Sequence, residues 1–171
     1  VVLSDEKGEF AGTLSSGEDI TEAREKEEEM AKLVTAVEQS PSVIIISDLW
    51  GNITYVNPKF TEVTGYSRDE ASGKNPRFLQ SGDVDKNIYK NLWETISSGK
   101  QWRGEFKNKK RDGSVYWESA SISPIMDYKN KIFAYIAVAE DITEKRKQEE
   151  ILAQSYERLK EVDKFKTNFT S

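Results

Sequence analysis

Residues 57–79 read NPKFTEVTGYSRDEASGKNPRFL and contain the start and stop signals of two short helices. Asn57 can cap a helix, the proline after it suits a first helical turn, and Gly65 can end that helix. Ser67 and Glu70 have the spacing of a capping box, in which each side chain accepts a hydrogen bond from the backbone N–H of the other residue. The stretch therefore predicts two short helices in succession.

Strand patterns lie on both sides of these helices. Before them, residues 42–48 hold a β-branched run and residues 53–56 read as a return strand, which together predict a hairpin. After them, apolar residues at helical spacing predict an amphipathic helix over roughly 84–98. Three further strands are predicted at 102–110, 115–125 and 132–138, with an Asp-Gly turn between the first two. This order predicts an α+β fold with an antiparallel sheet.

An internal repeat predicts how the chain is divided. The residues Glu-Asp-Ile-Thr-Glu occur at 18–22 and again at 140–144, which indicates a duplicated module. The predicted segments are the C-terminal end of a preceding module at 1–22, a linker helix at 23–40, a complete module at 41–144 and a C-terminal linker or coiled-coil helix at 145–171.

The composition excludes most catalytic chemistry. The 171 residues include no cysteine and no histidine, so disulfides, thiolate nucleophiles, histidine bases and the common metal ligands are excluded, and we expect no metal site and no enzyme activity. The net charge of −5 argues against nucleic-acid binding. No apolar run is long enough to span a membrane, so we expect a cytoplasmic fragment without membrane contact, whose parent is either soluble or membrane-anchored.

The predicted order of elements and several motifs resemble the PAS domain family. The motifs are Asn57-Pro58-Lys59-Phe60, Thr64-Gly65-Tyr66-Ser67, residues 73–79, Arg111-Asp112-Gly113-Ser114 and the Asp-Ile-Thr ending. The resemblance covers about 41–144. It implies a five-stranded antiparallel sheet with short helices on one face, a small ligand pocket between them, and flanking long amphipathic linker helices that receive a signal from the sheet.

The same resemblance narrows what the pocket could hold. Pro76 stands where light-sensing members have their reactive cysteine, so a cysteinyl-flavin adduct is disfavoured, and haem is disfavoured because the chain has no histidine. Residues 91–93, 102–105 and 108–113 resemble PAS domains that bind FAD without a covalent bond. This second resemblance implies four pocket residues: Trp93, Trp102, Phe106 and Asn108. A Trp ring can stack on a flavin, and an Asn amide can bind its polar edge. An unidentified small molecule and a filled, ligand-free core are the alternatives.

Two copies of the Asp-Ile-Thr motif predict signal junctions. The predicted elements place a strand before each motif and a helix after it. The junction residues are Asp141 and Thr143 in the complete module, and Asp19 and Thr21 in the repeat. There, an aspartate or threonine can cap the helix and favour the positive end of its dipole. In PAS proteins generally, this junction passes the signal from the sheet to the linker.

The last segment predicts a partner surface. Apolar residues recur three and four apart there, with Phe165 extending an interface formed by Leu152, Tyr156, Leu159, Val162 and Phe169. The first linker helix has a weaker heptad, with Ala23, Met30 and Val37 seven apart and Leu33 between them. Both segments together predict a parallel homodimer through the linker helices. A helix folded back on its own sheet is the alternative. Residues 163–171 resemble the approach to the phosphoacceptor helix of sensor histidine kinases, which predicts a downstream kinase domain in the parent chain. The sequence thus fits a sensory relay module, an FAD-binding redox sensor, or a ligand-free dimerisation and spacer module.

Overall fold

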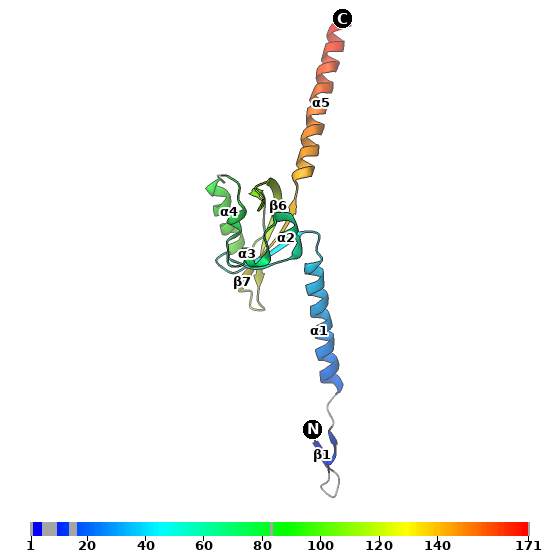
Figure 1. The fold of residues 1–171 in the computed structure, drawn as a ribbon, viewed down its shortest axis with the longest axis vertical. Helices are drawn as coiled ribbons and strands as arrows, with labels where there is room; N and C mark the ends of the chain where they lie inside the picture. The colour runs from blue at the N-terminus through cyan, green and yellow to red at the C-terminus, as the bar shows by residue number, and fades with distance from the viewer. Residues whose placement is uncertain (1, 5–9, 14–16, 83, 171) are drawn as a thin grey trace. The chain divides into compact units, whose positions relative to one another are not determined.

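The computed structural model describes residues 2–4, 10–13, 17–82 and 84–170, which belong to two separate units. The first unit, residues 1–38, contains a short antiparallel pair of strands, β1 (Val2–Ser4) and β2 (Phe10–Thr13). They are followed by α1 (Gly17–Glu38) (Figure 1).

Helix α1 begins earlier than the sequence analysis predicted. The predicted linker helix starts at residue 23, whereas α1 starts at Gly17. Asp19 and Thr21 therefore lie within the helix and not between a strand and a helix, as the repeat had indicated. The assignment of residues 1–22 to a preceding module stays a prediction.

The second unit is built on a five-stranded antiparallel sheet, as predicted. Its strands are β3 (Val43–Ser47), β4 (Ile53–Val56), β5 (Trp102–Lys109), β6 (Val115–Met126) and β7 (Ile132–Asp141). Their spatial order is β4-β3-β7-β6-β5, so the last strand in the sequence lies in the middle of the sheet. Strand β7 pairs with β3 as far as Ala139, and its last two residues, Glu140 and Asp141, pair with β6 alone before the chain continues into the final helix.

Short helices cover one face of this sheet (Figure 1). They are α2 (Pro58–Thr64), α3 (Arg68–Ala71), a 3₁₀ turn η1 (Pro76–Leu79) and α4 (Lys86–Ser97). The predicted caps are confirmed: the Asn57 side chain accepts the Phe60 N–H, Gly65 ends α2 in the left-handed conformation, and Ser67 and Glu70 form both bonds of the capping box.

A buried asparagine joins the helical layer to the sheet. Asn57 is 1% exposed, and its Oδ1 accepts the N–H of Ile44 at 2.9 Å while its Nδ2 donates to the carbonyl of Ser42 at 2.9 Å. Around it, Val56 and Phe60 are fully buried in the main apolar cluster. The cap of α2 is thus also a side-chain bridge to the first strand of the sheet.

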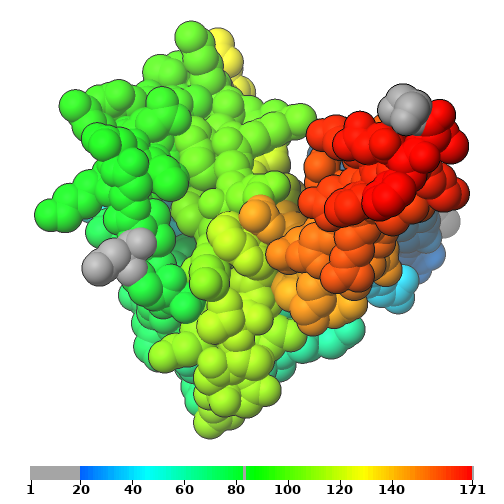
Figure 2. Space-filling view, turned by 90° about the horizontal axis from the view of Figure 1, so that it is seen from above, coloured from blue at the N-terminus to red at the C-terminus, as the bar shows by residue number. Residues whose placement is uncertain are grey.

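The final helix, α5 (Thr143–Phe169), contacts the sheet at its first turn and has no buried residue. Figure 2 shows this first part of α5 (orange) beside the yellow-green strands. Within the described part of the chain, no helix is long and apolar enough to cross a membrane.

Candidate functional site

A cavity of about 110 Å³ lies between the inner face of the sheet and the segment from η1 to α4. Most of its wall is apolar and aromatic, with Tyr89, Trp93, Phe106 and Tyr135 among the lining side chains. Trp93 meets Tyr135 edge to face at 5.7 Å, and Tyr89 stacks on Phe106 at 6.1 Å between ring centroids. A cavity of this size has room for a few water molecules or a small organic group.

One end of the cavity carries buried polar groups. Asn108 Nδ2 lies 3.5 Å from the Tyr116 hydroxyl, and that hydroxyl donates to Glu118 Oε2 at 3.3 Å. Burial raises the pKa of Glu118 to about 7, the Tyr116 hydrogen bond opposes this rise, and the nearby charge of Asp141 adds to it. Burial also raises the pKa of Tyr116, and the charge of Glu118 raises it further. Near neutral pH, Glu118 can therefore present either a hydrogen-bond donor or a charge to the cavity.

Three of the four predicted pocket residues line this cavity: Trp93, Phe106 and Asn108. The fourth, Trp102, begins β5 and packs against Phe106, and its indole N–H donates to Asn91 Oδ1 at 3.0 Å. Trp102 thus supports the wall without being part of the lining. Whether any of the four contacts a ligand stays a prediction.

Two titratable side chains of the polar end, Tyr116 and Glu118, were not predicted from the sequence. Along β6, the buried residues alternate with more exposed ones, and Tyr116, Glu118 and Ala120 are all buried. The alternation of inward and outward side chains along a strand was the signal that could have placed Glu118 in the interior. A carboxylate at an inward position is costly to bury and therefore indicates a functional group.

The junction after β7 is tied to β6 by hydrogen bonds. Asp141 Oδ1 accepts from both the N–H and the hydroxyl of Thr143, at 2.9 and 2.6 Å. Thr143 Oγ1 in turn accepts the N–H of Trp117 at 2.9 Å, and Ile142 N–H donates to the carbonyl of Trp117 at 2.9 Å. The N-cap residue of α5 is Ile142, whose side chain makes no capping hydrogen bond. Asp141, one residue earlier, instead accepts the first N–H of the helix, that of Thr143. The Thr143 hydroxyl oxygen bonds to β6.

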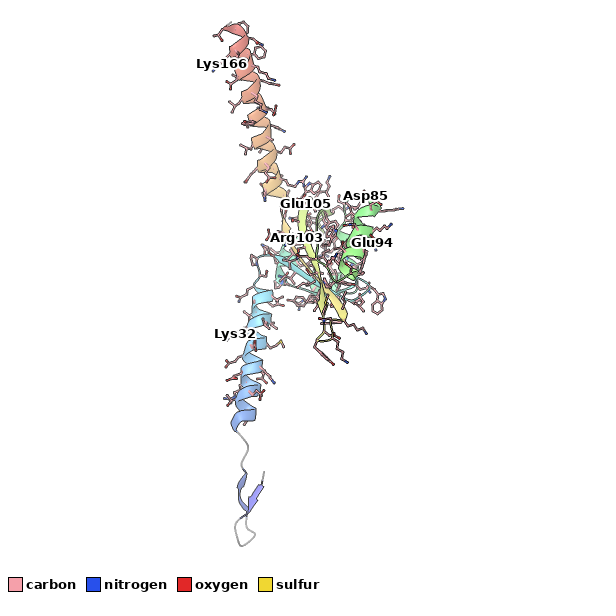
Figure 3. The ribbon with its side chains drawn as sticks, turned by 180° about the vertical axis from the view of Figure 1, so that it is seen from behind. Lys32, Asp85, Glu94, Arg103, Glu105 and Lys166 are labelled. Carbon is pink, nitrogen blue, oxygen red and sulfur yellow. The ribbon has the colours of Figure 1, made fainter. Side chains whose placement is uncertain are left out.

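An arginine adds a second attachment between α5 and the sheet. The guanidinium of Arg146 lies 3.8 Å from the centre of the Trp117 ring, and Arg146 also pairs with Glu105 on β5. Figure 3 shows Glu105 near the first turn of α5. An exposed ion pair contributes little to stability, but stacking of the guanidinium on an aromatic ring adds a further favourable contribution. The Arg146 contacts therefore help to orient the first turn of α5.

The described residues include no group of three or more Asp and Glu side chains that could bind a metal ion.

The sequence profile of the PAS domain family matches residues 41–144, which is more than half of the chain. The chain belongs to the PAS domain family. The PAS match includes all five strands of the large sheet, the cavity and the junction, and it ends at the second residue of α5. A PAS domain is itself a non-catalytic module.

Relatives of this PAS domain are parts of signal-transduction proteins. The chain is 37% identical over 109 residues to a nitrogen fixation regulatory protein of Klebsiella pneumoniae, a match that covers 64% of this chain and 22% of that protein. It is 36% identical over 119 residues to hybrid signal transduction histidine kinase L of Dictyostelium discoideum, covering 70% of this chain and 7% of the kinase. This chain thus spans under a quarter of either protein. It functions as a PAS sensory domain of the kind found in such proteins.

Among solved structures, the PAS domain resembles a light-oxygen-voltage domain whose mechanism was studied with a flavin analogue. The TM-score is 0.60 and the identity 25%, and the match covers 74% of this chain and 96% of that one.

Proposed function

We propose that this PAS domain is a signal-relay module of a two-component sensor histidine kinase. In this proposal, the state of the cavity passes through Asp141 and Thr143 to α5, and α5 pairs with a second copy of the chain. The kinase assignment is supported by a histidine kinase among the relatives and by the resemblance of residues 163–171 to the approach to a phosphoacceptor helix.

The observation that carries the relay is the position of β6 between cavity and junction. Glu118 and Ala120 line the cavity, whereas Trp117, the residue before Glu118, bonds to Ile142 and Thr143 at the start of α5. Successive residues of a strand point to opposite faces, so a ligand that moves β6 moves both its cavity face and its helix attachment. In this proposal, the junction at Asp141 and Thr143 couples movement of β6 to the direction of α5.

The dimer is supported by the apolar stripe of α5. The predicted interface residues Leu152, Tyr156, Leu159, Val162 and Phe169 are all between 50% and 85% exposed. Since no residue of α5 is buried, the described part of this chain does not cover the stripe, which argues against the folded-back alternative. A second copy with the same stripe can bury it as a coiled coil.

A distance measurement between two copies tests the dimer and the junction together. The chain has no cysteine, so Lys164→Cys provides a single site for a nitroxide label on the side of α5 away from the stripe. Double electron–electron resonance should give one narrow distance between copies. Thr143→Val removes the acceptor of the Trp117 N–H and should broaden that distribution, because α5 loses a bond that sets its direction.

Two matched substitutions serve as controls. Thr95→Val changes the same residue type in α4, where the hydroxyl bonds only within its own helix, and should leave the distribution narrow. Leu159→Asp should abolish the distance between copies, whereas Gln154→Asp adds the same charge off the stripe and should keep it. Absence of any distance between copies at high protein concentration would exclude the dimer. An unchanged distribution in Thr143→Val would exclude the junction as the link.

FAD binding is a second candidate function, favoured by the aromatic walls beside a polar end. Trp93 and Phe106 could hold a flavin ring, and Asn108 and Glu118 could bind its polar edge, where the cofactor would supply redox chemistry when bound. This donor set fits a flavin, but about 110 Å³ is below the roughly 300 Å³ of small ligand pockets, so FAD requires that the cavity open further. Pro76 lines the cavity where a reactive cysteine would be needed for a covalent adduct.

The absorption spectrum of freshly purified protein distinguishes these candidates. Visible bands of oxidised flavin that bleach on reduction are expected if FAD is the ligand, and Asn108→Ala should then lower the flavin content of the protein. A spectrum with aromatic absorption alone, unchanged after incubation with FAD, would remove this candidate and leave a smaller ligand or a ligand-free spacer.

A further inference from the structure

We infer that Glu118 and Asp141 are a pair of facing carboxyl groups through which the charge inside the cavity controls the junction at the start of α5. The two residues are direct partners in the register between β6 and β7. Side chains at directly opposed positions of an antiparallel pair lie on the same face and interact, and like charges there repel. This inference rests on the proposed relay function and names the groups that would operate it.

The Glu118 side of the pair belongs to the cavity. The residue is 7% exposed and lines the cavity wall. Its hydrogen-bond partner is the Tyr116 hydroxyl on its own strand, which Asn108 of β5 also contacts. The one cation among the described residues that line this cavity is Arg77, whose guanidinium lies 5.2 Å from the centre of the Tyr89 ring. The other polar side chains of the lining are those of Ser47, Asn75, Tyr89 and Tyr135.

The Asp141 side of the pair belongs to the junction. Its Oδ1 accepts both hydrogen bonds from Thr143, and its Oδ2 lies 3.9 Å from the ammonium of Lys110, the residue after β5. The same ammonium lies 5.5 Å from the centre of the Tyr116 ring. Asp141 is therefore a neighbour of the cavity acid, of a cation and of the first residue of α5 at the same time.

This arrangement makes the junction sensitive to the charge of Glu118. While Glu118 is protonated, Asp141 can hold Thr143 without a like charge opposite it. When Glu118 ionises, repulsion between partly buried carboxylates is only weakly screened by salt and favours movement of Asp141 toward Lys110, away from Thr143. A neutral ligand that accepts a hydrogen bond from Glu118 maintains the first state, and a ligand with a cationic group favours the second. The burial that raises the pKa of Glu118 to about 7 places this change near neutral pH.

A pH titration of the full chain followed by NMR tests the pair. The reporters are the backbone amides of Thr143 and Trp117, which donate to Asp141 and to Thr143, together with the side-chain carboxyl carbon of Glu118. Both amides should shift with the same midpoint as the Glu118 carboxyl, near pH 7. Glu118→Gln should abolish this titration of the amides. Asp141→Asn should lower the midpoint measured at the Glu118 carboxyl, because it removes the negative charge that raises the pKa of Glu118.

Glu140→Gln is the matched control, since Glu140 is next to Asp141 on β7 and its exposed side chain bonds Ser42 outside the cavity. It should leave the titration midpoint of the Glu118 carboxyl unchanged.

The inference is overturned if Glu118 titrates while the chemical shifts of both amides do not change, or if the amides of Glu118→Gln still titrate with the same midpoint. In that case, a broadened spin-label distance in Thr143→Val would still support the relay. If instead the amides follow Glu118 but Thr143→Val leaves the distance unchanged, the acid pair stands and the relay to α5 fails.

Discussion

Replacing Asn57 with alanine is expected to lower the free energy of unfolding by roughly 3 kcal/mol or more. The substitution removes the acceptor of the Ile44 N–H and the donor to the Ser42 carbonyl, and it removes the cap on the Phe60 N–H. The site is 1% exposed, so water cannot replace these bonds without opening the contact between α2 and β3. Each buried backbone group left without a partner costs about 1–3 kcal/mol, and loss of a helix cap adds about 1 kcal/mol.

Urea unfolding of Asn57→Ala beside Asn75→Ala measures this effect. Asn75 also caps a helical turn, accepting the Arg77 N–H, but it is only half-buried and its bond is exposed to solvent. Its replacement should therefore cost about 1 kcal/mol or less. Equal losses in the two variants would show that the bridge from Asn57 to β3 contributes nothing beyond an ordinary cap.

The second large effect is on the pH dependence of stability, and Glu118→Gln should change it. The pKa of Glu118 rises from 4.5 to about 7 on folding. A raised pKa means that the folded state holds the proton more tightly, so its contribution to stability is fully present below about pH 4.5 and is lost as the pH rises through about 7. The loss is on the order of 3 kcal/mol. Glutamine cannot ionise, so the stability of the variant relative to the wild type should increase over this interval.

Unfolding by urea at a series of pH values between about 5 and 8 measures this change. Asp48, Glu70 and Asp112 have pKa values lowered by hydrogen bonds, and their contributions change only at more acidic pH, so they do not interfere. Glu140→Gln should run parallel to the wild type, because its carboxylate is exposed on β7. A difference between Glu118→Gln and the wild type that stays constant with pH would contradict the raised pKa of Glu118.

Local signals explain why so much of the fold could be predicted. The caps at Asn57 and Ser67, the stop at Gly65 and the Asp-Gly turn near residue 112 act within a few residues, so neighbours in the sequence were sufficient to place them. The start of α1 was different, because the repeat with 140–144 implied a junction where the helix in fact continues back to Gly17. In the second copy, β6 binds Ile142 and Thr143, and the helix begins at Thr143, where these bonds are made.

The sequence by itself determined the PAS-type order of strands and helices, the absence of cysteine and histidine chemistry, and the apolar stripe of the last helix. These follow from composition, short-range capping and periodicity. Only the tertiary structure decided that Trp102 supports the cavity wall from behind, that Glu118 faces into the cavity, and that Asp141 lies opposite Glu118. The reason is strand register: a shift of one residue turns every side chain of a strand to the other face, and the register depends on neighbouring strands that are distant in the chain.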